Sequence, residues 1–188
     1  MSHYFDVDGL RESIYAVISH VLASEQFVGR YGIGVEEAER IVTHDAYWGH
    51  TRSIVSNRCL EIAVKTRNAA EALRAKGIDY STDKEVDVYN SGHLADGSKK
   101  AKDFIFICNK IIHAKEFRLD RQGHVARHKD LLWWGGMVTL EGTDQKNKEW
   151  CFFFIILDWC DSVLKFLNAT ENKLMDIRMS SYDLFNYQ

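Results

Sequence analysis

Apolar side chains recur every three or four positions from about residue 8 to residue 30. This spacing places them on one face of a helix. The stripe consists of Leu10, Ile14, Val17, Val21 and Leu22. Gly32 and Gly34 follow, and glycine favours the left-handed backbone that ends helices. The pattern therefore predicts a first helix over residues 8–30.

A second helical pattern covers residues 35–76, and its second half carries the clearest stripe. The members of that stripe are Val55, Cys59, Ile62, Thr66, Ala69 and Leu73. The middle of the stretch is polar and contains Gly49, which predicts a break into two helices. Gly77 is expected to end the pattern. The polar residues 77–98 then predict a long loop with an extended piece at residues 86–89.

Beyond this loop the period of the pattern changes. A helix is predicted from about residue 98, with Phe104 and Cys108 among its buried residues. Alternation follows at Phe117 and Leu119, and the turn-like residues 121–123 predict a hairpin whose return strand contains Val125. Residues 137–141 alternate again and predict another strand.

The last part of the chain predicts a long helix over residues 149–168. A polar turn at residues 144–148 precedes it, with Asn147 as the candidate N-cap. Apolar residues surround its first part as far as Leu157, which is typical of a central, buried helix. A short final helix is expected after Thr170. The predicted fold is mainly α, a bundle of about five helices. A small antiparallel β-hairpin or sheet is inserted before the last long helix, and one domain spans residues 1–188.

Composition supports this picture and narrows the class of protein. A length of 188 residues suits one domain, and the absence of proline fits long uninterrupted helices. The four cysteines form no CxxC pair, so neither a disulfide framework nor a zinc ribbon is expected. Residues 1–10 lack the features of a signal peptide, and the apolar run at 151–157 is shorter than the about 18 residues of a membrane span. We therefore expect a cytoplasmic protein that does not enter membranes.

Charge is distributed unevenly along the chain, although the net charge is only −3. Five basic residues lie between positions 115 and 129, against two acidic ones. These basic residues are Lys115, Arg118, Arg121, Arg127 and Lys129. Trp133 and Trp134 follow, and basic residues near aromatic ones can hold phosphates and stack bases. The tract predicts a nucleic-acid surface, and the alternative is a solvated hairpin with its tryptophans in the core.

The segment CNKIIHA, residues 108–114, carries the most specific candidate chemistry. On a helix Asn109 and His113 lie one turn apart, and an amide beside a histidine can fix its tautomer for acid–base work. The segment resembles the end of the motif of HEPN domains, helical bundles that often dimerise. Nuclease members of that family carry an arginine, then four to six other residues, then the histidine. Cys108 and Ile107 stand at such positions here, so the resemblance implies a catalytically inactive relative.

Other candidate sites are weaker. His44, Asp45 and His50 crowd one polar stretch, but a spacing of six does not place two imidazoles on one face of an unbroken helix. The sequence contains no glycine-rich phosphate loop and no HExxH motif, so no metal and no cofactor is predicted.

The sequence therefore predicts a non-catalytic HEPN-like protein that binds RNA or a protein partner, as a homodimer in keeping with the family. The alternative is a metal-independent HEPN-type ribonuclease with His113 and Asn109 as catalytic residues. Its missing cation would come from elsewhere, with Arg52, Arg58 and Arg67 as candidates. A histidine that serves only helix packing is the structural alternative for His113.

Overall fold

The computed structural model describes residues 6–31, 44–78, 92–94, 100–101, 104–125 and 128–183. Its elements in chain order are α1 (Val7–Tyr31), α2 (His44–Ala75), β1 (Gly92–Leu94), β2 (Lys100–Ala101), α3 (Phe104–Ile112), β3 (Glu116–Val125), β4 (His128–Thr143), β5 (Glu149–Ile155) and α4 (Ile156–Asp183). The described chain is mainly helical, with an antiparallel sheet before the last helix, as the sequence predicts.

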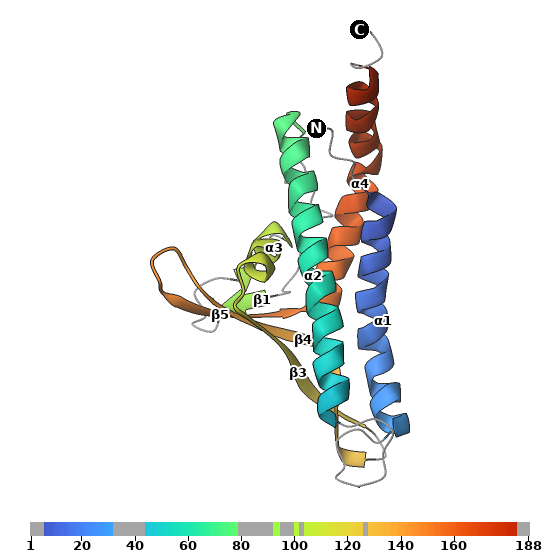
Figure 1. The fold of residues 1–188 in the computed structure, drawn as a ribbon, viewed down its shortest axis with the longest axis vertical. Coiled ribbons are helices and arrows are strands. Elements are labelled where there is room, and N and C mark those ends of the chain that lie inside the picture. The colour runs from blue at the N-terminus through green and yellow to red at the C-terminus, as the bar shows by residue number, and fades with distance from the viewer. Residues whose placement is uncertain are drawn as a thin grey trace.

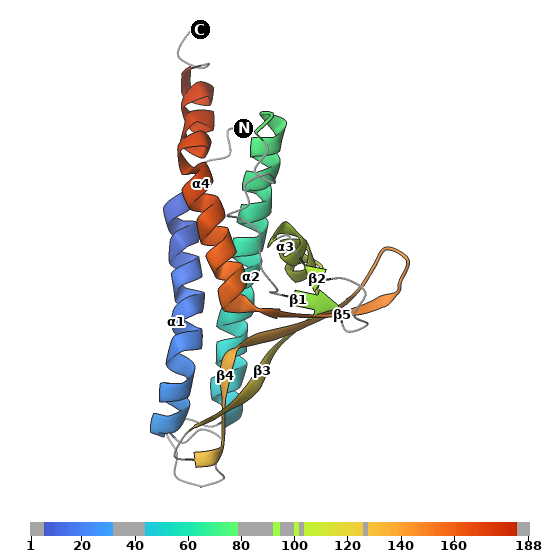
Figure 2. The same ribbon diagram turned by 180° about the vertical axis from the view of Figure 1, so that it is seen from behind.

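Three long helices, α1, α2 and α4, lie side by side and contact one another (Figure 1). The short helix α3 packs on α2 beside the sheet, and the sheet reaches out from the bundle. Seen from behind, the C-terminal part of α4 projects past the ends of α1 and α2 (Figure 2). None of the described helices is long and apolar enough to cross a membrane.

The first helix confirms the periodic pattern at Leu10, Ile14, Val17 and Val21, which are all buried. Leu22 was predicted to belong to the same stripe, but it is 66% exposed. The second helix departs from its predicted pattern. Helix α2 runs without a break through Gly49, so the helix is not divided at this glycine. Residues 35–43 of the predicted stretch lie outside the described residues. One glycine destabilises a helix by about 1 kcal/mol, less than is needed to interrupt a helix that buried side chains hold on both sides. The helix ends as expected at Gly77, whose φ is +73°.

The sheet contains five strands in the order β2-β1-β5-β4-β3, and every pair is antiparallel. The predicted hairpin is present, but its turn is not at residues 121–123. Strand β3 continues through these residues, and Val125 pairs with His128. Register shifts between Leu119 and Arg121 and between Arg121 and Gly123 accommodate the glycine, which in strands often marks a bulge.

The largest correction concerns residues 149–155, which form a strand and not the start of the last helix. β5 is the central strand of the sheet, and α4 begins directly after it at Ile156. Asn147 is consequently not a helix cap. It adopts a φ of +58° in the turn between β4 and β5, where its backbone N–H donates to the Asp144 carbonyl at 3.0 Å.

Two further boundaries differ from the prediction. Helix α3 begins at Phe104 and not near residue 98, because β2 occupies residues 100–101. α4 continues to Asp183, so no separate final helix follows Thr170. The described residues thus contain four helices where about five were expected. The extended piece predicted at residues 86–89 lies outside the described residues.

The two faces of the sheet differ in composition. Val138 and Leu140 on β4 and Phe152 and Phe154 on β5 are at most 1% exposed. They belong to one cluster of buried side chains that also includes residues of all four helices. Neighbouring residues in a strand point to opposite faces, so residues 137, 139, 151, 153 and 155 lie on the other face. We call this second face the outer face.

Candidate functional site

Asn109 and His113 lie one turn apart, as the sequence predicts. The backbone N–H of His113 donates to the Asn109 carbonyl at 3.1 Å, just beyond the last residue of α3. The His113 side chain is exposed. Among the described residues, no side chain forms a hydrogen bond or ion pair with it that could orient the ring. His113 is thus a solvent-exposed histidine that no described side chain orients.

Two of the three arginines considered as substitutes for the missing motif cation have other partners, and the third, Arg52, is exposed on α2. Arg58 Nη1 lies 3.0 Å from Glu61 Oε2 and 3.3 Å from the hydroxyl of Ser13 on α1. Arg67 Nε lies 2.8 Å from Glu71 Oε1 on the same helix. Lys110, three residues before His113, makes a cation–π contact: its Nζ lies 3.9 Å from the centre of the Trp150 ring.

The predicted nucleic-acid tract is divided between several environments. Arg118 Nε lies 3.1 Å from Asp120 Oδ1, and its Nη1 lies 3.3 Å from Glu141 Oε1. The Arg121 guanidinium stands 5.3 Å from the ring centre of Trp48 on α2. Lys115 is exposed, and its backbone N–H donates to the Glu141 carbonyl at 2.7 Å.

The two tryptophans of the tract differ in exposure, and only Trp134 is enclosed so that it cannot stack on a base. Trp134 is 0% exposed, its indole N–H donates to the Met137 carbonyl, and its backbone N–H donates to the Ser24 hydroxyl. Trp133 is half-buried and packs against the core. Arg127 lies outside the described residues, and the side chain of Lys129 does as well.

Of the candidate metal residues, the side chain of His44 lies outside the described residues. Among the described residues, no group of three or more His, Cys, Asp or Glu side chains could hold a metal ion. Asp45 and His50 are exposed on α2. His20 on α1 lies near His50, and its pKa is lowered by burial and then by the charge of the His50 ring.

The structure reveals a different candidate site on the outer face of the sheet. Arg118 stands opposite Thr139, and Thr139 stands opposite Phe153, so one row crosses β3, β4 and β5. The Thr139 hydroxyl donates a hydrogen bond to Asp120. Arg118 contacts both Asp120 on β3 and Glu141 on β4. These contacts join the polar side chains of the two strands in one network.

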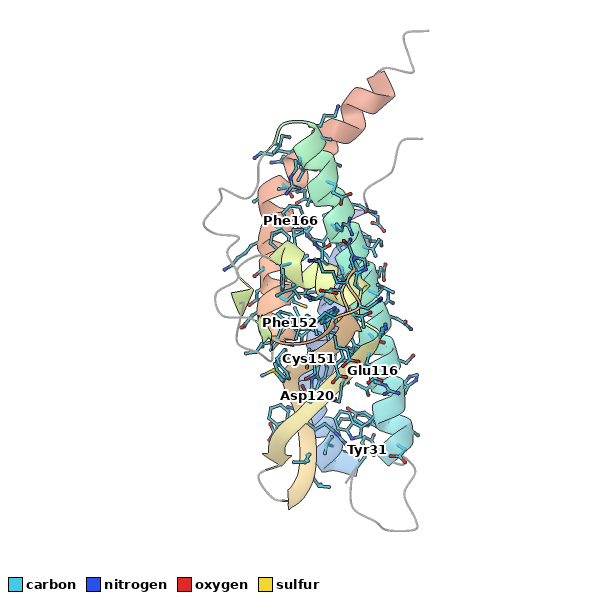
Figure 3. The ribbon with its side chains drawn as sticks, turned by 90° about the vertical axis from the view of Figure 1, so that its left-hand side faces the viewer. Tyr31, Glu116, Asp120, Cys151, Phe152 and Phe166 are labelled. Atoms are coloured by element: carbon cyan, nitrogen blue, oxygen red, sulfur yellow. The ribbon has the colours of Figure 1, made fainter. Side chains whose placement is uncertain are left out.

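The adjoining row contains two carboxylates. Glu116 on β3 is directly opposite Glu141 on β4, and Glu141 is opposite Cys151 on β5. Figure 3 looks onto this side of the molecule, with Glu116, Asp120 and Cys151 labelled on the sheet. Burial raises the pKa of the Cys151 thiol, and the Glu141 carboxylate raises it further.

An open depression of about 560 Å³ lies over the Arg118–Thr139–Phe153 row, beside the row that contains the two carboxylates. Its lining combines charged and apolar side chains from the three strands, namely Arg118, Leu119, Asp120, Arg121, Leu132, Met137, Thr139 and Phe153. Leu132 and Ile155 are 36% and 37% exposed. The outer face thus presents apolar side chains beside a charged network.

Only Arg118 and Arg121 of this site were predicted from the sequence, and both were predicted to bind nucleic acid. The other members come from separate strands, and their adjacency depends on a register that no local pattern specifies. The one usable signal was the alternation at residues 137–141, which places Met137 and Thr139 on the same face.

Comparisons of the chain with protein-family models, with curated proteins and with solved structures find no match.

Proposed function

We propose that this chain is a non-catalytic binding protein whose protein partner docks on the outer face of the sheet. The observation that supports the proposal is the depression lined by Met137, Phe153 and Leu132 on a face where Ile155 is also exposed. Apolar side chains grouped on one surface beside polar ones are typical of interaction sites. The resemblance to HEPN domains stays a prediction, and it agrees with a binding role.

A protein partner fits this surface better than a nucleic acid does. Arg118 already has two carboxylate partners, and the Glu116 and Glu141 carboxylates would repel a phosphate backbone. Trp134 is enclosed in the core and cannot stack on a base. An enzymatic role has less support, because the exposed His113 lacks a described partner that could position it or stabilise charge.

The experiment selects binders from a displayed library of random peptides on the folded protein. We expect selected peptides that lose binding to the Phe153→Ser and Ile155→Ser variants. They should retain binding to Leu60→Ser, a matched control with an apolar side chain 43% exposed on α2. Circular dichroism and thermal denaturation check that each variant is folded.

Two results would contradict the proposal. One is a set of selected peptides that bind equally well to the Ile155→Ser and wild-type proteins. The other is binding of single-stranded RNA or DNA at low salt that is abolished by reversing the charges of Arg118 and Arg121, as a nucleic-acid surface would require.

A further inference from the structure

We infer that the partner presents an arginine or lysine beside an apolar side chain, and that this cation docks on the pair Glu116–Glu141. The inference rests on the proposed function and adds the chemistry of the partner to it.

Carboxylates on the outer face are only partly paired with basic side chains. Glu116 and Glu141 are directly opposite each other on neighbouring strands, an arrangement that like charges destabilise. Arg118 is the described cation of this group, and its side chain reaches Asp120 and Glu141. Of the three carboxylates Glu116, Asp120 and Glu141, Arg118 pairs with the last two. Arg121 also lines the depression, and its guanidinium stands over the Trp48 ring. Within the described part of the chain, Glu116 has no basic partner.

The charged side chains of this part of the outer face are exposed to solvent. The side chains of Arg118 and Glu141 are 56% and 44% exposed, and Glu116 is exposed as well. A cation that arrives from solvent can therefore reach the carboxylates without a rearrangement of the sheet. It would relieve the repulsion between Glu116 and Glu141 while it forms its own ion pairs, so charge complementarity favours a basic partner.

The apolar lining of the depression lies one row away from the acidic pair. The row Glu116–Glu141–Cys151 is followed two residues along the strands by the row Arg118–Thr139–Phe153. Alternate residues of a strand are about 7 Å apart. A partner would match this distance with a cationic residue and an apolar residue two positions apart in an extended segment. The apolar side chain would enter the depression beside Phe153.

The edge of the sheet is less suited to docking than its face. β3 is the edge strand, and its register is shifted at three places between Leu119 and Val125. Bulges and charged side chains are devices that keep an edge strand from pairing with another chain. The partner's affinity should therefore come from side chains on the outer face.

Cys151 provides a reporter within the site. It is opposite Glu141, and it is half-buried, whereas Cys59, Cys108 and Cys160 are 0% exposed. A thiol reagent added to the folded protein should therefore modify Cys151 first. A segment bound across the two rows should slow that reaction.

The experiment uses three synthetic peptides that differ at one position, with an arginine, a glutamine or a glutamate two residues from a leucine. Binding is measured by fluorescence anisotropy and by protection of Cys151 from alkylation. We expect the arginine peptide to bind most tightly and to protect Cys151. Its binding should weaken as salt is added. The glutamate peptide should bind most weakly.

Variants of the protein isolate the role of the acidic pair. Glu116→Gln should lower the affinity for the arginine peptide roughly threefold, and the double change with Glu141→Gln should lower it roughly tenfold. The glutamine peptide should be unaffected. Glu12→Gln, an exposed glutamate on α1, is the matched control. Glu116→Gln should also raise the Tm or leave it unchanged, because it removes a like-charge pair.

The outcomes separate this inference from the proposed function. If the three peptides bind equally and all are lost on Ile155→Ser, the docking surface stands and the cationic partner is wrong. If the glutamate peptide or RNA binds best, the inference is overturned. If no peptide binds or protects Cys151, and light scattering shows a dimer that Ile155→Ser dissociates, the face is an interface between two copies, and the inference is also overturned.

Discussion

Gly136 on β4 lies directly against Val21 on α1. A Cβ atom at Gly136 would stand 3.2 Å from Val21 Cγ1 and 3.5 Å from Ile156 Cγ2, and the residue has a φ of +95°. We expect Gly136→Ala to lower the free energy of unfolding by about 1–3 kcal/mol, because it adds backbone strain and crowds a packed contact. Urea denaturation measures the change.

Gly135→Ala is the matched control for this prediction. Gly135 is exposed, and its nearest contact for an added Cβ is the Trp133 ring at 3.5 Å, an ordinary distance. A Gly135→Ala protein that is destabilised as much as Gly136→Ala would show that the close approach to Val21 is not the cause.

The strand assignment of residues 149–155 predicts an alternating response to truncation. Phe152→Ala and Phe154→Ala should each lower the free energy of unfolding by about 3–5 kcal/mol, since both rings are buried. Ile155→Ala on the outer face should change it by less than about 1 kcal/mol. Equal losses at residues 154 and 155, measured by chemical denaturation, would contradict this register.

The same residues show how far the sequence predicts the fold. The stripes of α1 and α2 span many turns, so the helical period is unambiguous there. The run CFFFIIL is too short for its period to be read, and a strand with one buried and one half-buried face resembles a helix that is apolar all round. The central strand was therefore predicted as a helix buried on all sides. The expected burial holds for Phe152 and Phe154 but not for Ile155, which is 37% exposed.

The thiol of Cys151 should react slowly at neutral pH. Burial raises its pKa from 9.0, and the charge of Glu141 contributes further, so less thiolate is present at a given pH. We expect the alkylation rate in the folded protein to rise with pH through and above 9. Glu141→Gln should increase the rate at a fixed pH. Mass spectrometry of protein treated with iodoacetamide follows the modification. A rate independent of Glu141 would contradict the assigned contact.

His113 provides the test between an enzyme and a binding protein. A metal-independent ribonuclease needs a cation to stabilise charge on the phosphorus oxygens, and loss of such a group slows a reaction by about a thousandfold. We expect the purified protein to cleave RNA at background rates, with no change on His113→Ala. Cleavage without metal that disappears on His113→Ala, in a protein with an unchanged Tm, would establish the nuclease.

His20 should make the stability of the α1–α2 pair sensitive to acid. Its pKa is lowered from 6.5, first by burial and then by His50, so the unfolded chain takes up the proton at a higher pH than the folded chain does. The stability contributed by the neutral ring is complete above about pH 6.5 and is lost as the pH falls through the lowered pKa. The fall in Tm from pH 7 to pH 5 should be smaller for His20→Gln than for the wild type. An equal fall in both proteins would contradict the prediction.

The candidate site could be predicted from sequence only in fragments. Arg118 and Arg121 could be predicted from the local excess of basic residues. Glu141 and Cys151, which lie near Arg118 in the sheet, are more than twenty residues away along the chain. Their adjacency comes from the pairing of β3, β4 and β5. The basic residues read along one strand thus lie beside a carboxylate that β4 contributes.

The strand order also has a consequence for the path of folding. β3, β4 and β5 are neighbours in sequence and in the sheet, so short loops bring them together. β1 must wait for β5, because its partner residues Phe152–Phe154 follow it by about sixty positions in the chain. We expect the β3–β4–β5 meander to form early and β1 with β2 to join late, since distant contacts close slowly. A chain emerging during synthesis would therefore hold β1 without its β5 partner until the central strand had followed.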